Sequence, residues 1–404
     1  MDANAEGCRP GRSVDVFTSC VKIGDFIFRC KIPIRVHSRP FAVLPSAVFR
    51  MNELLQLTIA DIAFGGKGVA RSDGKVFFVP FTAPGDVVTV RVVKEKKKFA
   101  EADLVSVDQA SPDRVAPLCP YFGRCGGCSY QHLAYEQQLA IKARQVEQTL
   151  RRVGRFAEVP MRPIVPAPAP YEYRNRIRVH VAGGVAGFFA HDAHSLVDVE
   201  RCAIASPEVN TALRRLRGAA VRDGDYSLRA SGGGPYFEQT NAGVTGELLA
   251  LLESLVRRGQ SLLVDAYCGA GIVAKRLAPL FEHVTGIEEN GNAVERASRD
   301  AAPHERYVAG DVAELLGDLL SAHDAARTTV ILDPPATGVV PRVTDLLLGA
   351  LPAEILYVSC NPATLARDLA VLASAYTLSS VTPLDMFPQT AEIEVVAHLV
   401  SRAA

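Results

Sequence analysis

The chain has 404 residues, 48% of them hydrophobic and 22% charged, and its 44 Lys and Arg residues equal its 44 Asp and Glu residues in number. These values are typical of a globular protein with two or three domains, and they exclude a largely disordered chain and a strong overall attraction to polyanions. No apolar run is long enough to span a membrane, and the N-terminus lacks a signal-peptide pattern, so we expect a cytoplasmic protein with no membrane partner. Nothing in the sequence indicates an obligate protein partner, and we expect a monomer.

Residues 1–50 show no clear periodicity, and we expect an extension that is either disordered or precedes the true start of translation at Met51. Beyond it, alternating segments separated by turns predict strands at 55–62, 76–80, 86–93 and 101–107. Strands this short and this closely spaced predict a small closed β-barrel of the oligonucleotide-binding type over 51–110. One of its hairpins carries Lys96, Lys97 and Lys98, which form either a solvated turn or a contact for RNA.

Four of the nine cysteines are grouped in a way that suits metal better than disulfides: Cys119, Cys125, Cys128 and the more distant Cys202. Gly126 and Gly127 let backbone N–H groups approach the sulfur atoms. Zinc and a [4Fe-4S] cluster both accept four thiolates, and the spacing does not separate them. The alternative is a set of unrelated buried cysteines.

A helix is predicted at 133–153, with an apolar face formed by Leu139, Ala143, Val146, Leu150 and Val153. After a Pro-rich linker, period-two alternation predicts a strand at 171–180 with Arg174, Arg176 and Arg178 on one face. Three guanidinium groups on one face suit a phosphate partner, whereas a solvated edge strand is the alternative. Two further helices are predicted, at 206–218 with Ser206 as its N-cap, and at 244–258.

The last part of the chain alternates strand and helix. Strands are predicted at 261–266, 284–287, 306–309, 329–332 and 355–358, with two more between 375 and 400. This pattern predicts a doubly wound parallel sheet. The predicted organisation is therefore a multidomain α/β plus β protein, with an extension at 1–50, a barrel at 51–110, a central α+β domain at 111–235 and a Rossmann-like domain at 236–404.

Gly269 and Gly271 form a glycine loop after the first of these strands, and acidic residues close the next three. Glu288 lies 23 residues after Asp265 (288 − 265), close to the ~20-residue offset at which a carboxylate accepts from ribose hydroxyls. The loop lacks the third glycine expected for a pyrophosphate, which disfavours a dehydrogenase and favours S-adenosylmethionine. Asp311 then suits the adenine amino group, and Asp333 lies beside the transferable methyl group.

Cys360 follows the predicted strand at 355–358, and a helical pattern begins at Pro362. The carboxyl end of a parallel strand is where such folds place their chemistry. The helix N-terminus is expected to lower the pKa of the Cys360 thiol. The alternative is a cysteine that simply packs as a small buried hydrophobe.

Several motifs together resemble the RNA uracil-C5 methyltransferase family: Val-Ser-Cys-Asn-Pro at 358–362, Asp-Pro-Pro at 333–335, Phe-Pro-Gln-Thr at 387–390 with Glu394 downstream, Phe-Glu-Gln-Thr-Asn at 237–241 and Asp-Ala-Tyr-Cys-Gly at 265–269. The match covers roughly residue 51 to the C-terminus. The barrel and the cysteines make the chain more similar to the 23S ribosomal-RNA branch, which carries a TRAM domain and an iron–sulfur cluster, than to the transfer-RNA branch.

The resemblance implies that Cys360 is the nucleophile and Glu394 the base, and that S-adenosylmethionine is held by Gln239, Tyr267, Glu288, Asp311 and Asp333 along the glycine loop. It also implies a [4Fe-4S] cluster on the four cysteines. The sequence departs from the family pattern at Ala336, Ile272 and Glu392, where arginine, a small polar residue and histidine are usual.

This reading implies a specific chemistry. Uracil C5 is a poor nucleophile until a thiolate adds to C6, and a base must then remove the C5 proton. The target uridine must also leave its stack to reach the cysteine. A transfer-RNA enzyme, a radical methylthiotransferase and an RNA-binding protein without catalysis are the competing interpretations, and the presence of Cys360 and Glu394 argues against the last.

Overall fold

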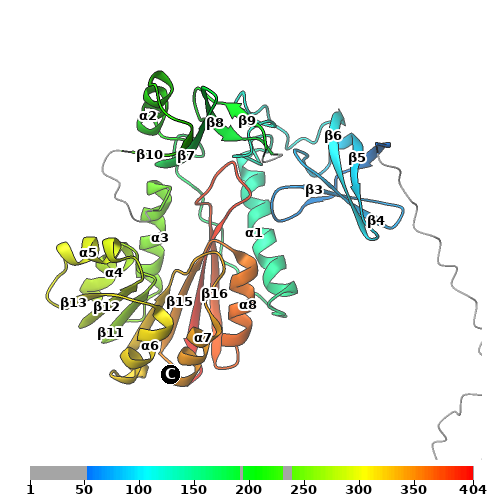
Figure 1. Ribbon diagram of the computed structural model, residues 1–404. Coiled ribbons are helices and arrows are strands. Elements are labelled where there is room, and N and C mark those ends of the chain that lie inside the picture. Colours follow the sequence, from blue (N-terminus) through cyan, green and yellow to red (C-terminus); the bar gives the residue numbers. More distant parts are fainter. Residues whose placement is uncertain (1–51, 192–193, 231–238, 404) are drawn as a thin grey trace, which may run out of the picture. The chain divides into compact units, whose positions relative to one another are not determined.

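The computed structural model describes residues 52–191, 194–230 and 239–403 (Figure 1). The predicted extension at 1–50 lies outside the described residues. Residues Ser46–Ala404 form one compact unit. No helix of the described part is long and apolar enough to cross a membrane.

The N-terminal sheet has six strands in the order β1-β5-β6-β4-β3-β2. They are β1 (Leu54–Thr58), β2 (Asp61–Ile62), β3 (Gly68–Ser72), β4 (Lys75–Val79), β5 (Val87–Glu95) and β6 (Phe99–Gln109). The sheet encloses one apolar core that includes Phe77, Val79, Val88 and Val90, as expected for a small barrel. The predicted single strand at 55–62 is two strands, and β3 was not predicted because its Gly-Val-Ala-Arg-Ser sequence is short and rich in small residues.

The central part consists of α1 (Tyr135–Arg152), α2 (Pro207–Gly218) and a four-stranded sheet in the order β10-β7-β8-β9. Its strands are β7 (Arg176–Ala182), β8 (Val185–Phe189), β9 (Leu196–Asp198) and β10 (Gly224–Arg229). Ser206 caps α2 as predicted, because its side chain accepts a hydrogen bond from the N–H of Val209. The alternation of β7 is confirmed from Arg176 onward, but Arg174 lies outside the strand and bridges Ala205 and Asn241 instead.

The predicted apolar face of α1 is wrong in part. Val153 lies beyond the helix and is 48% exposed, whereas the buried face of α1 includes Gln138, Lys142 and Gln145 beside Val146 and Leu150. The predicted face did not include these polar residues, because the hydrophobic pattern alone gives no sign of buried partners for them.

The C-terminal sheet has seven strands in the order β13-β12-β11-β14-β15-β17-β16. They are β11 (Leu262–Ala266), β12 (His283–Glu288), β13 (Glu305–Ala309), β14 (Thr328–Leu332), β15 (Glu354–Ser359), β16 (Tyr376–Leu384) and β17 (Glu394–Ser401). The first five are parallel as predicted, but β17 is antiparallel to both β15 and β16. The reason is that a short connection at 385–393 turns the chain back, so that β17 inserts between β15 and β16.

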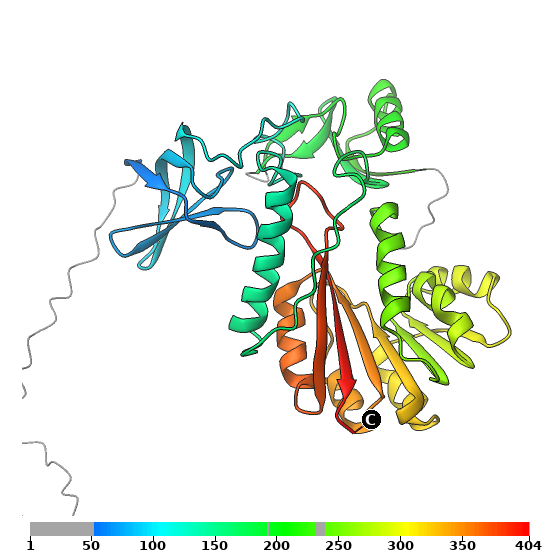
Figure 2. The same ribbon diagram turned by 180° about the vertical axis from the view of Figure 1, so that it is seen from behind.

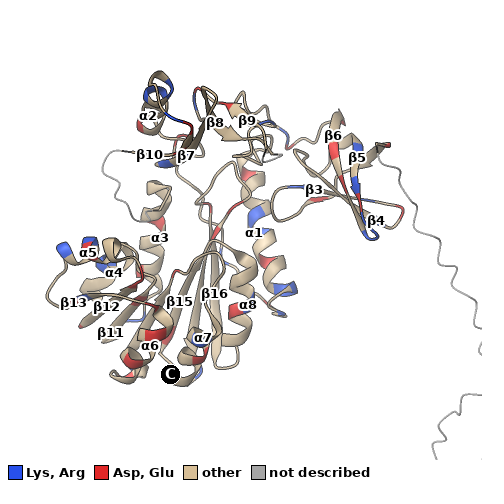
Figure 3. Cartoon of the chain, in the orientation of Figure 1, with Lys and Arg blue, Asp and Glu red and all other residues tan. Residues whose placement is uncertain are grey.

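Helices cover both faces of this sheet (Figures 1 and 2). The core on one face includes residues of α6 (Val312–Ser321), α7 (Pro341–Ala350), α8 (Pro362–Leu372) and α1. The core on the other face includes residues of α3 (Ala242–Leu255) and α4 (Ile272–Leu277), while α5 (Gly291–Arg299) follows β12. The strands of the sheet carry little charge in Figure 3, which fits their burial on both faces.

Asp86, at the start of β5, ties the barrel to the segment that follows it. Its fully buried carboxylate accepts hydrogen bonds from the N–H groups of Ala83 and Ser111, at 2.6 and 2.8 Å, and from Arg114 Nη2 at 2.5 Å. Burial raises the pKa of Asp86, but the hydrogen bonds from Arg114, Ala83 and Ser111 outweigh it and lower the pKa below its ordinary value of 3.8.

Asp86→Asn should destabilise the folded state by roughly 2 kcal/mol near pH 7, less than a fully buried ion pair because Arg114 stays partly exposed. A carboxylate with a lowered folded-state pKa contributes stability above its unfolded pKa, and this stability is lost as pH falls through the folded-state pKa. The difference from wild type should therefore shrink as pH falls below the ordinary carboxyl value of 3.8. Denaturant titrations near pH 7 and at acid pH measure it. The exposed Asp103→Asn is the matched control and should change stability little; an equal loss in both variants would contradict the prediction.

Candidate active site

A cavity of about 600 Å³ opens at the carboxyl ends of the parallel strands. Eight of the predicted site residues line it: Gln239, Tyr267, Gly269, Glu288, Asp311, Asp333, Cys360 and Glu394. Gly271 does not line it, and instead forms the N-cap of α4 with a φ of 77°, where an added Cβ would meet Tyr307 at 2.8 Å. Residues from seven separate segments of the chain thus meet in one cavity.

The loop after β11 is held in an unusual conformation. Tyr267 has a φ of 67° although it is not glycine, a left-handed conformation that costs about 1–2 kcal/mol. The Glu288 carboxylate accepts hydrogen bonds from the N–H groups of Gly269, at 3.0 Å, and Asn290, at 2.8 Å. Glu288 therefore fixes the glycine loop and still presents oxygen lone pairs to the cavity.

Two aspartates, the buried Asp265 and the partly buried Asp333, follow neighbouring strands near this loop. Asp265 accepts a hydrogen bond from the N–H of Ala274 at 3.0 Å. Burial, together with the charges of Asp333 and Glu288, raises the pKa of Asp265 to about 7, and burial raises the pKa of Asp333 to about 7. Asp265 supports the loop and was not assigned a role from the sequence, although its position at the end of an apolar strand was a usable signal.

Cys360 directly follows β15, and Asn361 caps α8 by accepting from the N–H of Ala363 at 3.0 Å. Asn361 also donates to the carbonyl of Ala336 at 3.0 Å, which joins the cysteine loop to the loop after Asp333. The expectation of a lowered Cys360 pKa does not hold for the ligand-free chain as a whole. Burial and the charges of Glu394 and Asp333 raise the pKa of Cys360 to about 11, and they outweigh the hydrogen bond from its own backbone that lowers it.

Glu394 begins β17 and is almost fully buried. Ser359 lies opposite Val395 in the β15–β17 pairing, so Cys360 and Glu394 are brought to the same edge of the sheet. Burial, reinforced by Asp333 and Glu392, raises the pKa of Glu394 well above its ordinary value. Glu392 is exposed, lies 4.0 Å from Arg174 Nη2 and does not line the cavity, so only Glu394 of the two carboxylates faces Cys360.

Cys119, Cys125, Cys128 and Cys202 line a second cavity, of about 370 Å³, although Cys202 is far from the others in sequence. Burial and the neighbouring cysteines raise the pKa of the Cys128 thiol to about 12. Within the described ranges, no group of three or more His, Cys, Asp or Glu side chains could hold a metal ion. The four thiols therefore line one cavity but, in the described residues, are not arranged as a metal site.

The predicted RNA-contacting residues are not gathered at the Cys360 cavity. Arg174, Arg176 and Arg178 line the cysteine cavity. Two of them have partners in β10, because Arg178 Nη2 lies 2.5 Å from Asp225 and Arg176 Nε lies 3.1 Å from Ser227 Oγ. Lys96, Lys97 and Lys98 are exposed in the hairpin between β5 and β6, and further arginines lie on α2 (Figure 3).

The residues 334–340, between Asp333 and α7, also line the Cys360 cavity, and the sequence interpretation assigned them no contact with a ligand. The half-exposed Val340 and the backbone of Gly338, with a φ of 76°, belong to this rim. The Pro-Pro pair at 334–335 was the available signal for a rigid loop here.

Known proteins resemble this chain along most of its length. Residues 317–402 match the family described as tRNA (Uracil-5-)-methyltransferase, and residues 52–105 match the TRAM domain. An uncharacterized RNA methyltransferase of Protochlamydia amoebophila is 32% identical, over 84% of this chain and 96% of its own length. Another from Thermosynechococcus vestitus is 31% identical, over 87% and 99%. The crystal structure of Pyrococcus abyssi tRNA (uracil-54, C5)-methyltransferase with S-adenosyl-L-homocysteine is similar, with a TM-score of 0.65 and 25% identity over 86% of this chain and all of that one.

In the ligand-free protein, alkylation of Cys360 by iodoacetamide should rise with pH toward a midpoint near 11, because the neighbouring carboxylates oppose the thiolate. Glu394→Gln should lower that midpoint, since it removes one of these charges. Asp311 lines the same cavity but does not raise the Cys360 pKa, so Asp311→Asn should leave the midpoint unchanged. Mass spectrometry of the Cys360 peptide measures the rates, and a wild-type midpoint below the ordinary value of 9.0 would refute this prediction.

Proposed function

We propose that this chain, which belongs to the RNA uracil-5 methyltransferase family and depends on S-adenosylmethionine, methylates C5 of a uridine in 23S ribosomal RNA through a covalent adduct of Cys360. The observation that carries the proposal is that Cys360, Glu394 and Asp333 line one cavity with Tyr267 and Glu288. A nucleophile, a base and a binding site for a nucleoside cofactor are thereby combined.

Cys360 and Glu394 divide the chemistry between them. The Cys360 sulfur forms a bond to C6 of the uracil, and the electron pair of the C5–C6 double bond moves onto C5 and its adjoining carbonyl. After C5 has taken the methyl group, Glu394 removes the C5 proton. The freed electron pair restores the C5–C6 double bond and expels the Cys360 thiolate. When bound, S-adenosylmethionine supplies the methyl group from a positively charged sulfur and leaves as neutral S-adenosylhomocysteine.

The charges of the site explain how Cys360 becomes reactive. In the free chain its pKa is raised to about 11, partly by Glu394 and Asp333. A positive charge brought into this acidic cavity opposes both carboxylates and lowers the thiol pKa. The thiolate is thus favoured when the cavity is loaded and suppressed when it is empty.

The cofactor-binding roles follow from where the residues lie. Glu288 presents a carboxylate beside Gly269, which suits ribose hydroxyls, and Asp311 follows β13, where it suits the adenine amino group. Asp311 also caps α6 by accepting from the N–H of Ala313 at 2.7 Å. Tyr267, Gln239 and Asp333 line the same cavity as Cys360.

We also propose that Cys119, Cys125, Cys128 and Cys202 hold a [4Fe-4S] cluster. Four thiols that line one cavity provide the donor set for such a cluster, and the resemblance to the ribosomal-RNA branch favours the cluster over zinc. Gln131 Nε2, Arg174 Nε and Thr240 Oγ1 are buried around the same cavity without hydrogen-bond partners, which suits an acceptor such as a thiolate or sulfide.

The choice of 23S ribosomal RNA is supported by the TRAM domain together with the gathered cysteines, the combination of the ribosomal branch that the sequence resembles. A transfer RNA is the second candidate, and it is favoured by the similarity to the Pyrococcus abyssi tRNA methyltransferase. The exposed Lys96, Lys97 and Lys98 and the arginines of β7 are the proposed backbone contacts for either RNA.

RNA containing 5-fluorouridine distinguishes these substrates, because fluorine at C5 cannot be removed by a base and the adduct accumulates. With S-adenosylmethionine and fragments of 23S RNA, we expect an adduct on the Cys360 peptide in mass spectra, absent in Cys360→Ala. With ordinary uridine, Glu394→Gln should slow product release by about 10²–10⁴-fold. An adduct only with tRNA would select the second candidate, and none with either RNA would overturn the proposed function.

The cluster is tested without an activity assay. Anaerobically purified protein should contain about four iron and four sulfide per chain with visible charge-transfer absorption, and Cys125→Ser should lose most of both. Cys268→Ser, outside the cysteine cavity, is the control and should keep them. Stoichiometric zinc without sulfide in the wild type would refute the cluster.

A further inference from the structure

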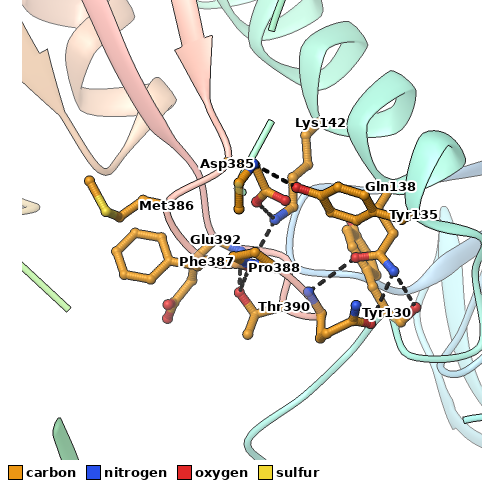
Figure 4. Close-up of polar contacts among 12 residues, drawn as sticks. Tyr130, Tyr135, Gln138, Lys142, Asp385, Met386, Phe387, Pro388, Thr390 and Glu392 are labelled. Atoms are coloured by element: carbon orange, nitrogen blue, oxygen red, sulfur yellow. Dashed lines mark hydrogen bonds and ion pairs between the residues drawn. The ribbon is translucent and has the colours of Figure 1, made fainter. Parts of the chain in front are cut away.

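The connection between β16 and β17, residues 385–393, is termed the base loop here because it leads directly into Glu394. It has no regular structure, yet of its residues only Phe387 and Glu392 are not buried. A buried loop has no ladder of its own to satisfy its backbone groups, so other elements must supply their hydrogen-bond partners. Two elements of the central part do so (Figure 4).

Helix α1 forms polar contacts with the base loop at two points. Gln138 and Gln389 form a reciprocal pair, since Gln138 Nε2 donates to Gln389 Oε1 at 3.0 Å and the Gln389 N–H donates to Gln138 Oε1 at 3.0 Å. One turn further along, Lys142 Nζ lies 2.6 Å from Asp385 Oδ1 and donates to the carbonyl of Phe387 at 3.0 Å. Lys142 and Asp385 are both completely buried.

Residues next to Cys128 also form hydrogen bonds with the base loop. The N–H groups of Ser129 and Tyr130, directly after Cys128, both donate to the carbonyl of Gln389 at 3.0 Å. Tyr173, which packs against Cys128, donates through its hydroxyl to the carbonyl of Pro388 at 3.0 Å. Gln389 is also held at a φ of 69°, a conformation that persists only where the surroundings impose it.

None of Gln138, Lys142 or Tyr173 lines the cavity of Cys360. Any effect on the reaction must therefore pass through the loop to Glu394. Packing alone would be served by apolar side chains, because a buried ion pair offers little net stability over a hydrophobic pair of similar volume. What the polar contacts add is a defined position for the loop, since each one has a direction.

We propose that Gln138 and Lys142 of α1, together with the N–H groups after Cys128, form a clamp that positions Glu394 for removal of the C5 proton. This inference rests on the proposed role of Glu394 as the base. Gln138 and Lys142 are positioning residues, and the step they serve is the one after methyl transfer. Ser129 and Tyr130, which follow Cys128, help to position Glu394 through their hydrogen bonds to the Gln389 carbonyl. This role requires no electron transfer.

Two volume-conserving variants test the clamp. Gln138→Met removes the reciprocal pair, and the double variant Lys142→Met with Asp385→Leu replaces the ion pair by an apolar one, so that folding is retained. Gln145→Met is the matched control, because Gln145 is a buried amide on the same helix whose Nε2 donates to the carbonyl of Ile62 in the barrel, at 2.9 Å, and not to the loop.

The substrate is 23S RNA fragment, or tRNA if that is the RNA that reacts, with tritium at uridine C5. Rapid-quench samples give the rate of adduct formation at Cys360 and the rate of tritium release. In both clamp variants we expect tritium release to fall 10- to 100-fold while adduct formation changes less than threefold, so that methylated adduct accumulates on ordinary uridine. Gln145→Met should change neither rate, and the melting temperature of each variant shows that it is folded.

Equal losses of both rates in the folded clamp variants would overturn the clamp and indicate a general structural role, as would rates matching those of Gln145→Met. If the wild type forms no adduct with either RNA, the proposed function itself fails, and that result is distinct because it precedes any comparison of variants. If adduct forms but Glu394→Gln releases tritium normally, Glu394 is not the base and the clamp has no step to serve.

Discussion

The antiparallel pairing of β17 with β15 is the constraint on which the candidate site depends. In this register Ser359 lies opposite Val395. Cys360 directly follows Ser359 and Glu394 directly precedes Val395, so both residues lie at the same edge of the sheet. A parallel β17 would begin at the opposite edge of the sheet and carry Glu394 away from Cys360. The inserted strand therefore adds Glu394, the proposed base, to the edge of the sheet where the parallel strands place the proposed cofactor-binding residues.

The second constraint is the burial of acidic groups around the cavity. In the free chain burial favours the uncharged forms, raising the pKa of Asp265 and Asp333 to about 7 and that of Cys360 to about 11. Acidic groups held in this way are stabilised in their charged forms by a cation. In the proposed mechanism, the positively charged cofactor and the Cys360 thiolate are therefore coupled through the carboxylates of the cavity, and the neutral product of methyl transfer weakens that coupling.

Much of this arrangement could be predicted because parallel strands buried on both faces appear as short apolar runs, and their following residues share one edge. Glu288, Asp311, Asp333 and Cys360 were located by that rule alone. The direction of β17 could not be predicted, since the residues 385–393 resemble neither a tight hairpin turn nor a crossover helix. The raised pKa of Cys360 was equally inaccessible, because its main causes are burial and a carboxylate, Glu394, that only the folded chain brings near.

The hydrophobic pattern of the sequence was most informative where it failed, at the polar residues of α1 that the structure buries. Gln145 reaches the barrel at Ile62, whereas Lys142 and Gln138 reach the loop before Glu394. Ile62 and Ala391 of the base loop also belong to one small apolar cluster with residues of the central part. Local rules are expected to break where a position serves function more than stability. The buried polar face of α1 fits that expectation, because it contacts both the barrel and the base loop. It thereby fixes Glu394, the proposed base, relative to the barrel proposed to hold the RNA.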